Sequence, residues 1–447
     1  MSDGPYKRKL ILGAGWAMGM KGMAGLLLFA NDALLARLIP VDDVGTYFLC
    51  FSLVTMTSIV SILGLDKAVV QGISESLAIG NKSRAWWYAR TSILVVSTTS
   101  LCAAILIGGP IGRQYINSLE QFSRLVNYTT PLAVWIVFYA IQLHLAEVFR
   151  GYHDIKLASA FGGAIRNAIM CVILLTCFFR EYQPSLSVIL WAAVISNSCS
   201  LVLAFIFVGK KKGGTTATAN KTSFGFVLAS LPLMILAFSQ AGLREMHLWV
   251  TASMTTTAQV SLLGVIIRFA NLLGTPVVLI GGVIQPSIPA LNQIADRRRL
   301  QKILQSAATI AAIPGTLVCV GLMIFPELAL KTIYGPEYAA ASIGLAIMGV
   351  AQIINLVTGS PAILMMMSGR RLSVMAIGLV CGTLGLIVTI LLVRKLGYLG
   401  AAIGYASGIA VQNIIYWSYC CFGMKVRTNA TLSVVPTILS AFKVRAG

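Results

Sequence analysis

The sequence predicts an all-α membrane protein whose chain crosses the bilayer about twelve times. The chain has 447 residues, of which 57% are hydrophobic and 11% are charged, and its mean hydropathy is +0.85. An average soluble domain carries about 25% charged residues, so this composition excludes that class. The apolar residues are also gathered into runs of about 20, which is the length that spans a bilayer as a helix.

Each expected span is one of these apolar runs, separated from the next by a short polar connection. The runs cover residues 10–36, 45–65, 87–109, 126–148, 157–179, 186–208, 223–243, 257–282, 303–325, 338–365, 372–393 and 399–422. A last apolar piece, 432–442, contains Pro436 and is too short to span, so we expect an interfacial helix or a frayed tail there. Prolines at 232, 276, 314 and 361 predict kinks in the second half of the chain.

The distribution of positive charge predicts the orientation of the chain. With the N-terminus in the cytoplasm, the inner connections hold 22 of the 34 Lys and Arg residues and the outer connections hold 8. Cytoplasmic loops of membrane proteins are enriched in Lys and Arg, so both termini are expected in the cytoplasm. The net charge of +20 therefore follows topology and does not indicate a nucleic-acid partner.

A polar connection divides the chain into two predicted lobes. Residues 210–221 form a cytoplasmic linker between an N-terminal lobe, 1–209, with spans 1–6, and a C-terminal lobe, 222–425, with spans 7–12. Residues 426–447 are expected to form a cytoplasmic tail. Sliding the first half by 214 positions places Gln71 on Gln285 and Arg84 on Arg298. Because each half has an even number of spans, the two lobes would share one orientation.

Three cations lie near the middle of expected spans. They are Lys21 in span one, Arg166 in span five and Arg268 in span eight. A charge at this depth costs roughly 2.5–3.5 kcal/mol even on an insertion scale, so it usually faces a bundle interior or a water-filled path. We expect these cations to bind an anionic substrate in a cleft between the lobes. The alternative is that each makes a neutralised packing contact.

Span one carries further charged candidates. Lys21 and Asp32 are eleven residues apart, which returns to within about 20° of the same helix face. Lys21 is expected to meet the substrate, together with Arg37 nearer the outer end. Asp32 is expected either to pair with Arg37 or to respond to protons, and a structural ion pair with another helix is the alternative.

Charges at the ends of spans two and four have a simpler interpretation. Glu147 and Arg150 are one helical turn apart, and Asp66 precedes Lys67 at the end of span two. We assign Glu147, Arg150 and Asp66 to coupling or gating, with an ordinary boundary ion pair as the alternative. The remaining histidines near connections, His153 and His247, are expected at the surface.

Several stretches resemble a known family. Residues 34–47 (LLARLIPVDDVGTY) and 63–71 (LGLDKAVVQ) look like the opening of Wzx-type polysaccharide exporters. Residues 334–341 (YGPEYAAA), the turn at Gly369 and residues 396–403 (LGYLGAAI) are similar to the second half of the same proteins. The resemblance implies the fold of the multidrug/oligosaccharidyl-lipid/polysaccharide (MOP) exporter superfamily, which includes the MATE transporters. In that fold two six-helix lobes surround a central cavity that opens alternately to each side.

The resemblance also implies a function. Wzx-type members are flippases that move undecaprenyl-pyrophosphate-linked oligosaccharides to the outer leaflet of the bacterial cytoplasmic membrane, for O-antigen, capsule or exopolysaccharide assembly. A polysaccharide polymerase and chain-length or export machinery are then candidate partners beside the lipid bilayer. No cofactor is expected, and proton or sodium coupling is left open. The alternative is a MATE-like ion-coupled antiporter of small molecules.

The sequence lacks the motifs of two other protein classes, ATP-driven exporters and membrane enzymes. An ATP-driven exporter would carry a G-x-x-x-x-G-K-[ST] loop, which does not occur. An enzyme acting on the same lipid would need a nucleophile with its base, or paired carboxylates, beside a roomy outer surface. The outer connections are short and offer neither, so we expect a transporter and not an enzyme.

Overall fold

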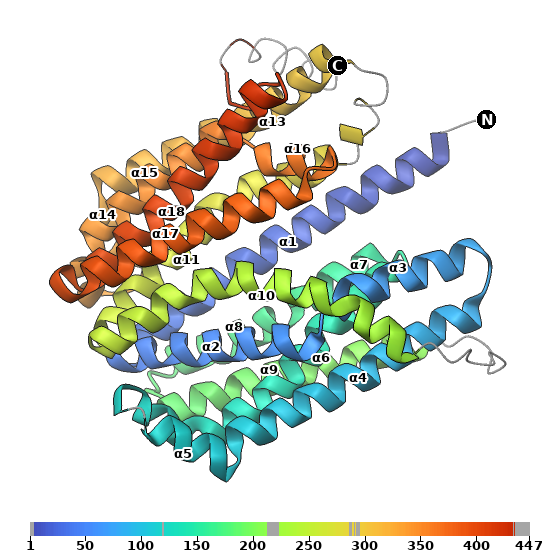
Figure 1. Ribbon diagram of the computed structural model, residues 1–447. Helices are drawn as coiled ribbons and strands as arrows, with labels where there is room; N and C mark the ends of the chain where they lie inside the picture. The colour runs from blue at the N-terminus through green and yellow to red at the C-terminus, as the bar shows by residue number, and fades with distance from the viewer. Residues whose placement is uncertain are drawn as a thin grey trace. The chain divides into compact units, whose positions relative to one another are not determined.

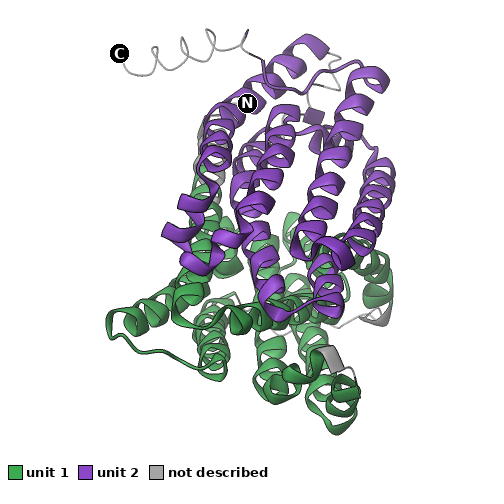
Figure 2. Cartoon of the chain, turned by 90° about the vertical axis from the view of Figure 1, so that its left-hand side faces the viewer, with its two compact units in different colours: residues 1–245 green, residues 246–447 purple. Residues whose placement is uncertain are grey.

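The chain folds into two compact helical units, residues Met1–Glu245 and Met246–Gly447 (Figure 2). The computed structural model describes residues 4–118, 120–211, 223–285, 288–289, 291, 296–431 and 433. All secondary structure in these ranges is helical. The unit boundary falls inside helix α10 (Ser223–Met254), later than the predicted linker, of which residues 212–221 lie outside the described ranges.

The first unit contains the helices that precede α10 (Figure 1). They are α1 (Gly4–Leu38), α2 (Val41–Ile62), α3 (Leu65–Ala78), α4 (Lys82–Gly108), α5 (Pro110–Ser118), η1 (Glu120–Tyr128), α6 (Thr129–Gly151), α7 (Ile155–Ser159), η2 (Ala160–Ala164), α8 (Ile165–Phe179) and α9 (Leu186–Gly209). Helix α6 packs against α2, α3, α4 and α9, and α1 packs against α7, η2 and α8.

The second unit contains the helices that follow α10. They are α11 (Thr257–Ile284), α13 (Arg297–Ile324), α14 (Pro326–Ile333), η3 (Pro336–Ala341), α15 (Ser342–Thr358), α16 (Pro361–Met367), α17 (Arg371–Leu396), α18 (Tyr398–Ser418) and η4 (Tyr419–Gly423). Helix α15 packs against α11, α13 and α18, and α18 also packs closely against α17.

The expected spans correspond to these helices. Eleven of the described helices are long and apolar enough to cross a membrane, and they coincide in order with expected spans two to twelve. The first expected span falls on α1, a continuous helix of 35 residues. The all-helical polytopic membrane fold is therefore confirmed.

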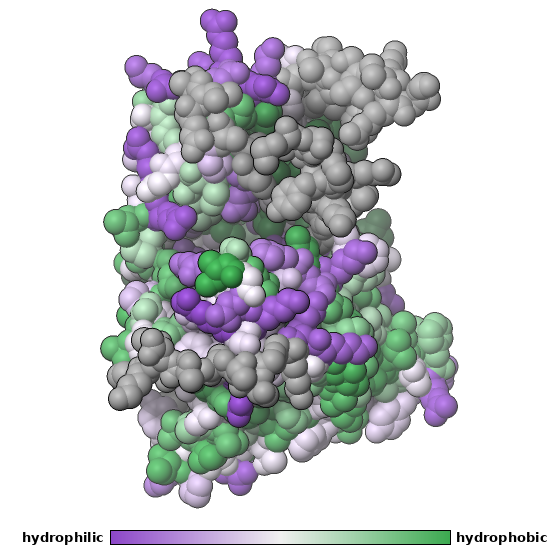
Figure 3. Space-filling model, turned by 90° about the vertical axis from the view of Figure 1, so that its right-hand side faces the viewer, coloured by the Kyte–Doolittle hydropathy of each residue, from purple (hydrophilic) through white to green (hydrophobic). Residues whose placement is uncertain are grey.

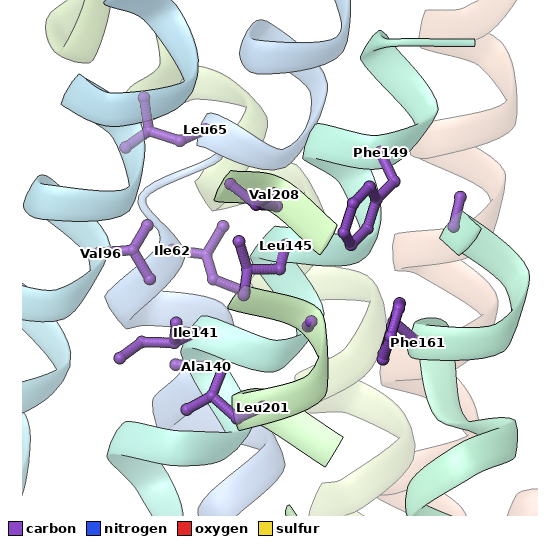
Figure 4. Close-up of a cluster of buried hydrophobic side chains, with 12 residues drawn as sticks. Ile62, Leu65, Val96, Ala140, Ile141, Leu145, Phe149, Phe161, Leu201 and Val208 are labelled. Atoms are coloured by element: carbon purple, nitrogen blue, oxygen red, sulfur yellow. The ribbon is translucent and has the colours of Figure 1, made fainter. Parts of the chain in front are cut away.

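Apolar side chains form the core of the first unit (Figure 4). Ile62, Leu65, Leu145 and Phe149 are among the buried residues of a cluster that draws on α2, α3, α4, α6 and α9. Phe161 of η2 stacks on Phe149 of α6 with ring centroids 5.4 Å apart. These contacts fix the position of α6 against its neighbours, and α6 supplies side chains to the site described below.

The outer surface is strongly apolar along the flanks of the helices. Leu317, Leu372 and Val172 are 74%, 76% and 64% exposed. On the face drawn in Figure 3, hydrophilic residues form a band across the middle and a separate group at the top, and apolar residues cover much of the surface below the band. A soluble protein would not leave so many large apolar side chains in water, so these flanks suit contact with lipid tails.

The turn between α2 and α3 depends on glycine. Leu63 and Gly64 both have positive φ angles, 55° and 74°. A Cβ atom on Gly64 would overlap the main-chain oxygen of Ser230 on α10. The Ser230 hydroxyl in turn donates a hydrogen bond to the Leu63 carbonyl oxygen at 2.8 Å. Glycine at position 64 therefore lets α10 approach the turn closely.

Expected span ten is broken between α15 and α16, where α16 begins at Pro361. The other three prolines of the prediction, Pro232, Pro276 and Pro314, lie inside α10, α11 and α13, which continue through them. Pro361 has no N–H, so the Val357 carbonyl four residues earlier loses its helical partner. A segment after η4 supplies the missing donors. The Ala430 N–H donates to the Val357 carbonyl oxygen at 2.8 Å, and the Thr428 hydroxyl donates to the Thr358 carbonyl oxygen at 2.9 Å.

We call residues 426–431 the C-terminal strap. Beyond its bonds to the break, it reaches α13, where the Thr431 N–H donates to the Thr309 hydroxyl at 3.0 Å. Thr428 is fully buried and Val426 is 3% exposed. The strap thus belongs to the packed second unit, whereas most of the remaining predicted tail lies outside the described residues.

Candidate functional site

A distortion in expected span five sets the position of Arg166. Helix α7 passes into a π-helical turn, η2, in which Gly163 has φ 149° and ψ −26°, and α8 then begins at Ile165. Such a φ angle is open to glycine and strained for other residues. Gln142 of α6 braces this turn by donating hydrogen bonds to the Phe161 carbonyl oxygen and to the Ser200 hydroxyl, both at 2.9 Å.

Arg166, the second residue of α8, is half-buried and held by neutral groups. Its guanidinium carbon lies 4.3 Å from the ring centroid of Tyr139 on α6. Its Nη2 donates to the Tyr139 hydroxyl at 3.3 Å, and its Nε donates a long hydrogen bond to Asn167 Oδ1 at 3.5 Å. Nη1 is buried and has no acceptor among the described residues.

Arg166 makes no ion pair within the described part of the chain. Its charge is therefore not neutralised by a carboxylate there, which is the alternative that the sequence left open. A positive charge stacked on an aromatic face retains its full charge while gaining about 0.5–2 kcal/mol from the ring. Arg166 consequently remains able to attract an anion.

Two asparagines join this part of α8 to α1. The Asn167 side-chain amide donates to the Ala24 carbonyl oxygen, and the Asn31 side-chain amide donates to the Asn167 carbonyl oxygen, each at 3.0 Å. Asn31 is 6% exposed and its neighbour Asp32 is 2% exposed. A buried polar group in an apolar helix is costly unless it is bonded, so these contacts fix α1 against α8.

The other predicted cations are more exposed or lie in the second unit. Lys21 lies on α1 with its side chain exposed. Arg37, in the last turn of α1, is also exposed. Arg268 is half-buried on α11 of the second unit. Their assignment to substrate binding stays a prediction.

The charges at span ends form the ion pairs that their spacing predicted. Arg150 Nη1 lies 2.6 Å from Glu147 Oε1, and Lys67 Nζ lies 3.5 Å from Asp66 Oδ2. The Arg150 and Lys67 side chains are 48% and 63% exposed, which makes both pairs boundary contacts of modest strength. A coupling or gating role for Glu147, Arg150 and Asp66 stays a prediction.

The prediction for His247 was wrong. It was expected at the surface because it fell near a connection, but α10 continues to Met254 and buries it. Its Nδ1 lies 2.7 Å from the Thr389 hydroxyl oxygen of α17. His153, which has a positive φ of 58°, is exposed in the turn after α6 as expected.

Sequence reasoning found Arg166 and missed the residues that hold it. Tyr139 lies 27 residues earlier and gave no signal, because one tyrosine in an apolar span is unremarkable. The adjacent polar pairs Asn31–Asp32 and Arg166–Asn167 did give a sequence signal. Each of these polar residues lies inside an apolar run and therefore needs a buried partner. Within the described ranges, no group of three His, Cys, Asp or Glu residues is placed to hold a metal ion.

Comparison with known proteins identifies the family. Residues 10–295, more than half of the chain, match the family described as polysaccharide biosynthesis protein. The chain belongs to this family. No curated protein matches the sequence of the chain.

Several solved structures share the fold of this chain. An inward-facing MATE-family multidrug transporter of the MOP superfamily aligns with a TM-score of 0.77 at 14% identity, covering 92% of this chain and 98% of its own. The lipid II flippase MurJ, in an inward closed conformation, aligns with a TM-score of 0.67 at 13% identity, covering 93% and 88%. A mutant of the Vibrio cholerae MATE transporter VcmN aligns with a TM-score of 0.62 at 16% identity, covering 93% and 97%. The chain therefore has the fold of these MOP-superfamily proteins, and its eleven described apolar helices indicate a multi-pass membrane protein.

Proposed function

We propose that this protein is a flippase for lipid-linked oligosaccharides. It would move undecaprenyl-pyrophosphate-linked repeat units from the inner to the outer leaflet of the bacterial cytoplasmic membrane, for surface polysaccharide assembly. The family match to polysaccharide biosynthesis proteins and the fold shared with the lipid II flippase MurJ support this class. The protein would act as a transporter, without making or breaking covalent bonds in its substrate.

The neutral environment of Arg166 is the observation that carries the proposal. A substrate that crosses the bilayer with a pyrophosphate must exchange its hydration for other partners, and an arginine held by a tyrosine and an asparagine can offer them. Guanidinium groups bind phosphate oxygens through paired hydrogen bonds. Arg166 would bind the pyrophosphate in the first unit, and Lys21, Arg37 and Arg268 would add positive charge along the path.

Both termini would lie in the cytoplasm, as the charge bias of the connections indicates. The partners of the protein would be the lipid bilayer, the lipid-linked substrate and the polymerase and export machinery of the same polysaccharide. Buried Asp32 would couple transport to a proton or sodium gradient, since an acid inside a span commonly marks an ion path.

A leaflet-resolved assay in proteoliposomes tests the proposal. Polyprenyl-pyrophosphate-linked sugar carrying a fluorophore is placed in both leaflets, and a membrane-impermeant quencher reports the fraction in the outer one. The purified protein should accelerate exchange between leaflets, and Arg166→Ala should reduce that rate at least tenfold. Exchange no faster than in protein-free liposomes would refute the proposal.

An ion-coupled antiporter of small molecules is the second candidate. Buried Asp32 and the close fold match to a MATE-family transporter favour it. The same proteoliposomes, loaded with a cationic dye and placed in a pH or sodium gradient, distinguish the two functions. Dye efflux that requires Asp32, with no lipid exchange, would establish the antiporter instead.

A further inference from the structure

Tyr139 has a fixed ring that faces the Arg166 guanidinium. The side chain is 5% exposed, and Phe51 of α2 meets it edge to face with ring centroids 6.0 Å apart. Phe51 also packs on Trp135, one turn earlier on α6, at 5.8 Å. Aromatic pairs prefer edge-to-face contacts, so this packing favours one orientation of the Tyr139 ring. Tyr139 is thus a rigid platform built by α2 and α6.

The contacts of Arg166 divide its donors into used and unused sets. The Asn167 side-chain oxygen accepts a hydrogen bond from Nε, and the Tyr139 hydroxyl accepts one from Nη2. Both Nη1 hydrogens have no acceptor among the described residues, although this nitrogen is buried. A guanidinium offers five N–H donors in a rigid plane, so the end bearing Nη1 is the part left for a ligand.

We propose that Tyr139 is the positioning residue for Arg166. It holds the guanidinium by its π face and its hydroxyl so that the Nη1 end meets the diphosphate oxygens of a polyprenyl diphosphate. This inference rests on the proposed function, because it assigns the same site an anionic lipid substrate. In this proposal Tyr139 does not touch the substrate and acts only by positioning Arg166.

The choice of tyrosine has a physical reason. A carboxylate would hold an arginine more strongly, but it would cancel the charge that attracts the diphosphate. An aromatic ring and a phenol restrain the guanidinium while leaving its charge intact. A lysine could not replace Arg166 on this platform, because its ammonium lacks the flat fork that stacks and bonds at once.

Binding of radiolabelled farnesyl diphosphate to the full chain in lipid nanodiscs tests the proposal. Tyr139→Phe removes the hydroxyl and keeps the ring, so it should raise the dissociation constant about threefold. Tyr139→Leu removes both contacts and should raise it about tenfold or more. Tyr152→Phe is the matched control, because the Tyr152 hydroxyl is buried without a hydrogen-bond partner in the described chain.

The Arg166→Met background separates positioning from a general structural role. If Tyr139 acts only through the arginine, Tyr139→Leu should change binding no further in that background. Equal losses in both backgrounds, or wild-type binding by Tyr139→Leu alone, would overturn the positioning role. Tyr139→Phe retains the ring packing, so it keeps the test decisive if the leucine variant fails to fold.

Binding by the wild-type protein tests the proposed function separately. Failure of wild type to bind farnesyl diphosphate would overturn both the anionic-lipid site and the positioning role. Wild-type binding that Arg166→Met weakens, combined with unaltered binding by both Tyr139 variants, would overturn only the role of Tyr139. Weakened binding by the Tyr139 variants solely when Arg166 is present is the expected result.

Discussion

The side-chain amide of Asn31 on α1 donates a hydrogen bond to the main-chain carbonyl oxygen of Asn167 on α8, at 3.0 Å. The bond is anchored on main chain, so it does not depend on which side chain occupies position 167. A second bond, from the Asn167 amide to the Ala24 carbonyl oxygen, runs the other way at 3.0 Å. The two helices are therefore tied by two bonds that can be removed one at a time.

Because the two bonds share no atom, we expect their losses to add. Asn31→Leu and Asn167→Leu should each lower the free energy of unfolding by about 0.5–1 kcal/mol, and the double variant by the sum. Chemical unfolding of the purified protein in detergent measures this. A double variant no less stable than either single variant would show that the two bonds are not independent links between α1 and α8.

The three intramembrane cations should each be needed for transport. We expect Lys21→Ala, Arg166→Ala and Arg268→Ala each to abolish surface-polymer export while membrane insertion continues, because each removes attraction for an anion. Polymer at the cell surface and protein in the membrane fraction are the two measurements. Lys331→Ala is the control, since Lys331 pairs with Glu327 on α14. Normal export by all three variants would end the case for a cationic path.

Two glycines with the same backbone angle should respond differently to alanine. Gly64 and Gly80 both have φ +74°, but only Gly64 has neighbours that a Cβ would meet. Gly80→Ala should cost about 1 kcal/mol of stability from backbone strain alone. Gly64→Ala should cost at least about 3 kcal/mol, because α10 must also move away. Thermal unfolding in detergent compares them, and equal costs would mean that the contact with Ser230 is unimportant.

The C-terminal strap should stabilise the second unit. Ala430→Pro removes the N–H that donates to the Val357 carbonyl oxygen. Thr428→Val removes the hydroxyl that donates to the Thr358 carbonyl oxygen. Each should lower the free energy of unfolding by about 1–2 kcal/mol and speed hydrogen exchange at the start of α16. Ser433→Ala, which leaves these bonds in place, is the control. Unchanged exchange in both variants would contradict the role of the strap.

Much of the fold could be predicted because membrane spans are encoded locally. A run of about 20 apolar residues must form a helix in lipid whatever surrounds it. The break at Pro361 was also local, since a proline removes its own N–H. The same reasoning located Arg166, because an uncompensated charge in such a run stands out.

The details of the site could not be predicted because they depend on distant contacts. The distortion at Gly163 is accompanied by a hydrogen bond from Gln142, on another helix, to the buried Phe161 carbonyl oxygen. Tyr139 becomes significant only when α6 and α8 pack together. The prediction for His247 was wrong for a related reason, because its burial depends on a contact with Thr389, which lies 142 residues later on α17.

The strap also has a consequence for biosynthesis. Val357 leaves the ribosome about 70 residues before Ala430, its hydrogen-bond donor. At about 5–20 residues per second, several seconds of translation separate the two. Span ten must therefore be inserted while one of its carbonyl groups is still without its final partner. The strap can pack only after it has been made, so a stop codon before Thr428 would leave span ten inserted but permanently without the donors that Thr428 and Ala430 supply.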